Sequence, residues 1–164
     1  MGLQSHDRHL GRTGDPAGPR AGDGLCEDQP LAEVPLLLTA AQHDSSLAVR
    51  QAAVHALGVH SSPQSAEGLI ALLADGATPA ELRADAAEAL AHVPDEHVLP
   101  ALITALEDPS PSVRFSAAYA LGEQGDAAAR DPLQRLAATD RADTPYGSVA
   151  GQAAQALAGL DDAD

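Results

Sequence analysis

Residues 113–122 read VRFSAAYALG, and this stretch is the best evidence for the fold because the chain carries three more versions of it. The equivalent stretches read VRQAAVHALG at 49–58, LRADAAEALA at 82–91 and VAGQAAQALA at 149–158. In each one the apolar residues recur at the spacing of a single helix face. The recurrence at steps of 31 to 36 residues therefore predicts one helix of the same kind in each of four repeats.

A second helical segment precedes each of these stretches. The four segments begin at Pro35, Gly68, Pro100 and Pro132, which are 32 or 33 residues apart. Because both sets of segments recur at nearly the same period, they indicate a repeat of two helices, which we name helix A and helix B in chain order. The Ala positions of helix B let neighbouring helices approach closely, and Leu and Val fill the space between them. We therefore predict an all-α fold, a short right-handed αα superhelix of about four two-helix repeats.

The turns before helix B carry their own signals. Three of them place a hydroxyl residue directly before a proline, namely Thr78-Pro79, Ser110-Pro111 and Thr144-Pro145. A hydroxyl can cap a helix, and proline is tolerated at the first helical position because its missing N–H would have no partner there. Ser46 occupies the matching place in the first repeat, and Thr78 with Glu81 has the spacing of a capping box.

The segments outside the repeats differ in composition. Residues 1–29 are rich in Gly and Pro, carry mixed charges and contain few apolar side chains, so we predict a disordered tail. Residues 30–160 form the predicted repeat domain. Residues 161–164 are acidic, and we interpret them as a solubilising end.

Charge and cysteine content narrow the classes of function. The chain has 24 Asp and Glu against 9 basic residues, all of them Arg, for a net charge of −15. Such a chain repels polyphosphates and anionic lipid surfaces, so we predict neither a nucleic-acid partner nor a membrane. No apolar run approaches the roughly 20 residues that span a bilayer. The single cysteine, Cys26, permits no internal disulfide, which favours a cytoplasmic location.

The stretch 113–126, VRFSAAYALGEQGD, resembles a HEAT-like repeat of the kind found in phycobilisome bilin lyases and in many unrelated bacterial adaptors. The resemblance covers residues 31–160 and is specific for the repeat class rather than for an activity. A tetratricopeptide repeat would carry a Trp and a Gly-Tyr signature, and an ankyrin repeat would carry Thr-Pro-Leu-His. Neither signature is present.

The resemblance also implies a structural ladder. In the family, an Asp in the turn between helices A and B pairs with the Arg of helix B. Two repeats match this pattern at a spacing of six residues, Asp44 with Arg50 and Asp108 with Arg114. The second repeat has two extra residues between its Asp and its Arg, and the fourth carries Ala150 in place of the Arg. The missing Arg suggests that the last repeat is a cap.

The outward positions of helix B are candidates for binding a partner. Those we select are Gln51, His55, Glu88, Phe115, Tyr119 and Gln155. The two aromatic residues lie four positions apart on the face opposite Val113, Ala117 and Leu121, and exposed aromatics in a groove are favoured anchors. The alternative is that these rings pack on a neighbouring helix or on the tail.

No residue pattern indicates catalysis. The seven His residues show no metal-ligand spacing, and no nucleophile or cofactor motif accompanies them. We therefore assign no catalytic residue, metal or cofactor, although His55 facing Glu88 would suit proton transfer. We predict a monomeric, non-catalytic adaptor that docks a peptide, a helix or a basic protein partner on its helix B face. The alternative is a bilin-lyase-like protein or enzyme that holds a small molecule in the same groove.

Overall fold

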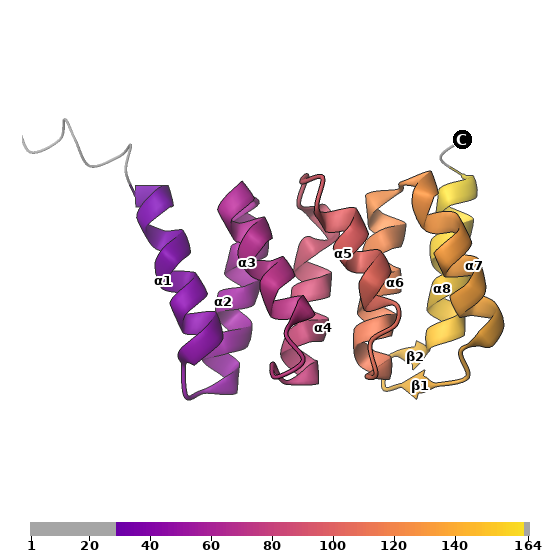
Figure 1. Cartoon of the computed structure of the whole chain (residues 1–164), viewed down its shortest axis with the longest axis horizontal. Coiled ribbons are helices and arrows are strands. Elements are labelled where there is room, and N and C mark those ends of the chain that lie inside the picture. The colour runs from indigo at the N-terminus through magenta and orange to yellow at the C-terminus, as the bar shows by residue number, and fades with distance from the viewer. Residues whose placement is uncertain (1–28, 163–164) are drawn as a thin grey trace, which may run out of the picture.

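The computed structural model describes residues 29–162, and these form eight α-helices that follow one another along an elongated array (Figure 1). Residues 1–28 of the predicted tail (1–29) and residues 163–164 of the predicted acidic end (161–164) lie outside the described residues, whereas Gln29 begins α1 and Asp161 ends α8. Helix A and helix B alternate along the chain. Their bounds are α1 (Gln29–His43), α2 (Leu47–His60), α3 (Pro63–Ala74), α4 (Ala80–Ala89), α5 (Val98–Ala105), α6 (Pro111–Gln124), α7 (Arg130–Thr139) and α8 (Val149–Asp161).

Short elements complete the repeats. A 3₁₀ turn, η1 (Leu90–His92), continues α4, and another, η2 (Ala127–Ala129), leads into α7. Strands β1 (Asp143–Thr144) and β2 (Gly147–Ser148) form an antiparallel hairpin between α7 and α8. The predicted all-α repeat superhelix is confirmed, and the hairpin is a local insertion in its fourth repeat.

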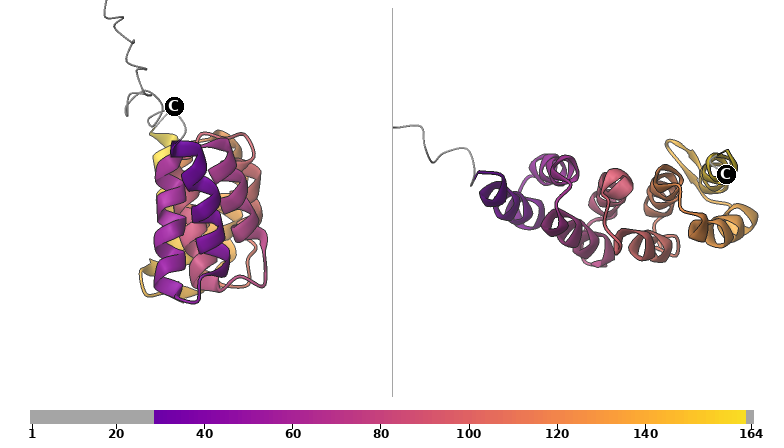
Figure 2. Two further views of the ribbon diagram at one scale, coloured as in Figure 1. Left: turned by 90° about the vertical axis from the view of Figure 1, so that its left-hand side faces the viewer. Right: turned by 90° about the horizontal axis from the view of Figure 1, so that it is seen from above.

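The helices form two layers. Seen from above, α1, α3, α5 and α7 make one row and α2, α4, α6 and α8 make the other (Figure 2). The helix B row is continuous, because α2 packs on α4, α4 on α6 and α6 on α8. No helix of residues 29–162 combines the length and the apolar character needed to cross a bilayer.

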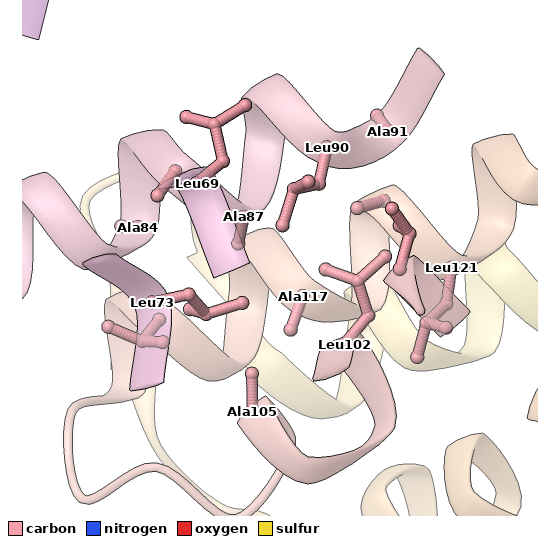
Figure 3. Close-up of a cluster of buried hydrophobic side chains, with 14 of the residues drawn as sticks. Leu69, Leu73, Ala84, Ala87, Leu90, Ala91, Leu102, Ala105, Ala117 and Leu121 are labelled. Carbon is pink, nitrogen blue, oxygen red and sulfur yellow. The ribbon is translucent and has the colours of Figure 1, made fainter. Parts of the chain in front are cut away.

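The core lies between the two rows. Leu69 and Leu102 from the A helices meet Leu90 and Leu121 from the B side, and all four side chains are fully buried (Figure 3). Ala117 is also fully buried, which lets α6 approach its neighbours closely. Leucines therefore fill the space between the rows, and alanines set the distance between helices.

Serines cap several helices. Ser46 accepts a hydrogen bond from the backbone N–H of Val49, and Ser62 accepts one from that of Ser65. Ser148 caps α8 by accepting from the N–H of Gly151. These caps satisfy N–H groups that have no partner within their helix.

Two of the predicted caps are wrong. Thr78 is buried and donates its hydroxyl to Asp75, while Pro79 takes the N-cap position of α4, so no capping box forms with Glu81. Thr144 lies in the hairpin instead of capping α8, because the longer connection delays the start of that helix to Val149. Ser110 does precede Pro111 at the start of α6, but its side chain makes no capping hydrogen bond.

Candidate functional site

A cavity of about 820 Å³ opens on the helix B face, which is the surface formed by α2, α4 and α6. Four of the six residues selected from the sequence line it: Gln51, His55, Glu88 and Tyr119. They come from three successive repeats, so the stacking of repeats builds the cavity. Its volume falls in the range of about 300–1,000 Å³ that is usual for ligand sites.

Small residues form part of the lining. The lining includes Ala52, Gly58 and Ala89, where larger side chains would fill the space. A Cβ atom added at Gly58 would lie 2.9 Å from the Cβ of Ala89 and 3.0 Å from its carbonyl oxygen. Helices α2 and α4 are therefore as close as a glycine permits. Val59 is 72% exposed and adds an apolar wall.

Two carboxylates of α4 also line the cavity, and neighbouring helices hold each of them in place. The side-chain amide of Gln51 donates to Asp85 Oδ2 at 2.7 Å, and the Ser116 hydroxyl donates to Glu88 Oε1 at 3.0 Å. Within residues 33–162, no hydrogen bond engages the second oxygen of either carboxylate. Each carboxylate is thus held in position and keeps one oxygen that can accept a further hydrogen bond, which suits recognition of a cation.

Two histidines border these carboxylates. His55 on α2 and His92 on η1 line the cavity and are both exposed. Among the described residues, no group of three or more His, Cys, Asp or Glu side chains is placed to hold a metal ion.

The structure separates the two aromatic residues of α6. Tyr119 is 37% exposed and lines the cavity. Phe115 is half-buried and packs against the hairpin, with its ring centroid 6.3 Å from that of Tyr146. The alternative for the two rings is packing on a neighbouring helix or on the tail, and the ring contact of Phe115 is instead with the hairpin. Gln155 is exposed on α8, one repeat beyond the cavity.

Arginine–aspartate pairs form a ladder along the turns between helices A and B. Arg83 of α4 donates to both oxygens of Asp108 in the next turn, at 3.0 and 2.9 Å. Arg114 of α6 pairs with Asp140 after α7, at 2.6 Å from its Nε. Each pair therefore joins one repeat to the following one.

This arrangement corrects the pairing expected from the family pattern. Arg114 reaches its own turn only through the main chain, donating to the carbonyl oxygen of Asp108 at 2.7 Å. The carboxylate of Asp108 is already engaged by the backbone N–H of Ser110 and by the preceding repeat's arginine. The spacing of six residues places the Arg114 guanidinium over the backbone of its own turn. Its remaining N–H groups therefore point to the next repeat.

The first repeat departs further from the expected pairing. The Nε of Arg50 donates to the carbonyl oxygen of Ala41 at 2.8 Å instead of to Asp44. Within residues 33–162, neither Arg50 nor Asp44 forms an ion pair. Arg50 and Asp75 instead line a second cavity of about 580 Å³, where the equivalent pair of later repeats would lie.

The pairing changes the acidity of both ladder aspartates. Burial by itself raises the pKa of Asp108, but the hydrogen bonds from Arg83 and from the Ser110 N–H outweigh it and leave the pKa below its ordinary value. Burial likewise raises the pKa of Asp140, but the hydrogen bonds from Arg114 and from the Ala142 N–H outweigh it, so this pKa is also lowered. Both groups therefore favour the charged form in the folded state.

This shift predicts a pH dependence of stability. A carboxyl whose folded pKa is lowered stabilises the fold fully above its unfolded pKa, about 4, and this contribution is lost as the pH falls through the lower folded value. We expect Asp108→Asn to cost about 2 kcal/mol at pH 7 and progressively less below pH 4. Urea denaturation of both proteins across this range measures the difference. A cost that stays constant from pH 7 to pH 3 would contradict the assignment.

The sequence reasoning missed several residues of these sites. Asp85 lines the cavity but was not among the outward positions of helix B selected from the sequence. Asp75 and Asp140 belong to a column with Asp44 and Asp108 at steps of 31 to 33 residues. This period could have identified Asp140 in the turn of the fourth repeat. Each of the four aspartates accepts a hydrogen bond from the backbone N–H two residues further on.

Comparisons with known proteins agree with this architecture. The model of the family described as HEAT repeats matches residues 74–158. Human deoxyhypusine hydroxylase, solved in complex with glycerol, is 24% identical with a TM-score of 0.68, over 80% of this chain and 44% of that one. The complex of CpcE and CpcF of phycocyanin lyase from Nostoc sp. PCC7120 is 25% identical with a TM-score of 0.64.

The second match covers 90% of this chain and 58% of the other. This chain therefore spans about half the length of the solved structures that it resembles. A comparison with curated proteins gives no match.

Proposed function

Because this chain belongs to the HEAT repeat family, we propose that it is a non-catalytic adaptor that binds a basic segment of a partner protein on its helix B face. The observation that carries the proposal is the cavity that Asp85, Glu88 and Tyr119 line together with apolar residues such as Val59 and Ala89. A lysine or arginine side chain has matching parts, an aliphatic stem and a cationic head. The carboxylates accept from the head, and the aromatic ring supports it.

Charge supports a basic partner over the other classes. The net charge of −15 attracts cationic segments and repels nucleic acids and anionic lipid surfaces. The chain itself is proposed to act as a cytoplasmic monomer.

The proposed partner can be captured through Tyr119. A photoreactive phenylalanine analogue at this position should cross-link the segment that occupies the cavity, and mass spectrometry identifies that segment. The control carries the analogue at Gln134, which is exposed on α7 in the other row. We expect a lysine- or arginine-bearing peptide from the first position and not from the second.

Binding of that peptide should depend on the two carboxylates. The double variant Asp85→Asn with Glu88→Gln keeps both side-chain shapes and should weaken binding about tenfold, or 1.4 kcal/mol, by calorimetry. The matched control, Glu81→Gln with Glu107→Gln, makes the same change in net charge at exposed positions outside the cavity. Equal losses in the two variants would mean that overall charge, and not the cavity, attracts the peptide.

A second candidate is a carrier or lyase of a bilin-like small molecule. The match to the phycocyanin lyase complex favours it, together with a cavity large enough for a small ligand. Adding a free bilin tests this candidate directly. A shift in its visible absorbance that is lost on Tyr119→Ala would support the small-molecule function, and an unchanged spectrum would reject it.

A further inference from the structure

Two carboxylates share one face of α4 in the helix B cavity. Asp85 and Glu88 both line the cavity and lie three residues apart on this helix. Residues at that spacing are neighbours on a helix surface, with Cβ atoms about 5–6 Å apart. Like charges so close together destabilise a helix unless a positive charge offsets them. The cavity therefore holds a pair of negative charges rather than a single one.

The hydrogen bonds that hold this pair bring no positive charge. The donors are the amide of Gln51 on α2 and the hydroxyl of Ser116 on α6, and both groups are neutral. Helices α2 and α6 each pack on α4, so the two carboxylates are held independently by two different neighbours. Within residues 33–162, one oxygen of each carboxylate still has no donor, which gives the cavity two separate acceptors.

The arginines of the helix B face do not supply the missing charge. Arg83 and Arg114 are engaged in the ladder pairs with Asp108 and Asp140. Arg50 donates its Nε to a backbone carbonyl oxygen and lines the second cavity instead. The sequence contains no lysine, and no arginine of the described chain lines the cavity of the helix B face.

The two histidines of the cavity do not offset the pair either. His55 and His92 line the cavity, but within residues 33–162 neither forms an ion pair with Asp85 or Glu88. A neutral imidazole carries no charge to set against a carboxylate. The ionised pair thus depends on a ligand for its positive charge.

We propose that the bound segment of the partner is extended and carries two basic residues separated by one, so that one cationic head meets Asp85 and the other meets Glu88. The inference rests on the proposed function and adds the sequence pattern that the cavity selects. In an extended chain, alternate side chains point to the same side and lie about 6.5–7 Å apart, close to the spacing of the pair on α4. The aliphatic stems then lie along Val59 and Ala89 of the lining.

Three synthetic peptides test the pattern on the unchanged full-length chain. All have Gly-Ser ends that are acetylated and amidated, so that the termini carry no charge. The first contains Lys-Ala-Lys. In the second, norleucine replaces one lysine, which keeps the aliphatic stem and removes the ammonium group. The third contains Lys-Lys-Ala, which keeps the charge but turns neighbouring side chains to opposite faces of an extended chain.

Fluorescence anisotropy at low ionic strength measures the three affinities. We expect the Lys-Ala-Lys peptide to bind about tenfold more tightly than the norleucine peptide, because it adds a second hydrogen bond between charged groups. It should also bind more tightly than the Lys-Lys-Ala peptide, by at least about threefold, because only alternate lysines reach both carboxylates.

Single substitutions assign the two heads. With Asp85→Asn or with Glu88→Gln, the advantage of Lys-Ala-Lys over the norleucine peptide should fall below about threefold, because one carboxylate remains for two ammonium groups. The control, Glu81→Gln with Glu107→Gln, removes two charges outside the cavity and should keep the tenfold advantage.

The outcomes separate this inference from the proposed function. Equal binding of the Lys-Ala-Lys and norleucine peptides, with a loss in the cavity variants, shows that the cavity takes a single cation and overturns only the inference. Equal binding of the Lys-Ala-Lys and Lys-Lys-Ala peptides shows that charge without spacing is recognised, which also overturns it. Binding of no peptide, or binding that is the same in both single variants and the wild-type chain, contradicts the proposed function as well.

Discussion

Arg83→Met should lower the free energy of unfolding by about 3 kcal/mol, since removing one partner of a buried ion pair leaves the other charge without compensation. Arg83 is only 7% exposed and holds both oxygens of Asp108, whose side chain is 11% exposed. Methionine keeps most of the aliphatic stem, so the loss reports on the charge rather than on packing. Equilibrium unfolding in urea, followed by helical circular dichroism, measures it.

Arg130→Met is the matched control. Arg130 pairs with Asp161 at the surface, where the two side chains are 31% and 63% exposed. Solvent screens such a pair, so we expect a loss below about 1 kcal/mol. If both variants lose the same stability, the ladder pair adds nothing that an exposed pair does not.

Gly58→Val should cost about 3 kcal/mol, the upper end of the usual range for overpacking. Its Cβ would meet the backbone carbonyl oxygen and the Cβ of Ala89, and neither can move aside by rotating a side chain. Helices α2 and α4 must then separate, which also disturbs the lining of the cavity, to which both residues belong. Gly122 of the third repeat makes the equivalent close approach to Ala156 of the fourth repeat. Urea denaturation again gives the stability.

The control for this substitution is Gly159→Val. Gly159 lies in α8, and a Cβ atom placed there meets no heavy atom within 4 Å. The change in stability should stay within about 0.5 kcal/mol of zero. A large loss at both positions would show that valine in a helix, rather than close helix packing, is the cause.

The repeat columns were enough to predict the helices and their two-layer arrangement. Leucines and alanines recur at a fixed period because every repeat meets the same neighbours, so one aligned stretch describes all internal contacts. The same reasoning failed at the first repeat. Val49 matches its column in sequence, but no described repeat lies before it, and it is exposed.

Sites that join repeats were harder to predict. Four cavity residues follow from the outward positions of helix B, whereas the ladder partners could not be chosen by spacing alone. Arg114 is six residues from Asp108 in sequence but pairs with Asp140, because the distance between turns depends on how the repeats stack. The hairpin that contacts Phe115 is an insertion before the last helix B. Its presence is evident from the wider spacing between the third and fourth helix B stretches, but the spacing does not give its shape.

The proposed function is binding of a basic protein segment on the helix B face. An amide NMR titration tests this binding: the wild-type chain is titrated with the free peptide that cross-linking at position 119 has identified. The largest shifts should fall on Gln51, His55, Glu88 and Tyr119, while Gln134 on α7 stays unchanged. Shifts concentrated on α3, α5 and α7, with these four amides unmoved, would contradict it.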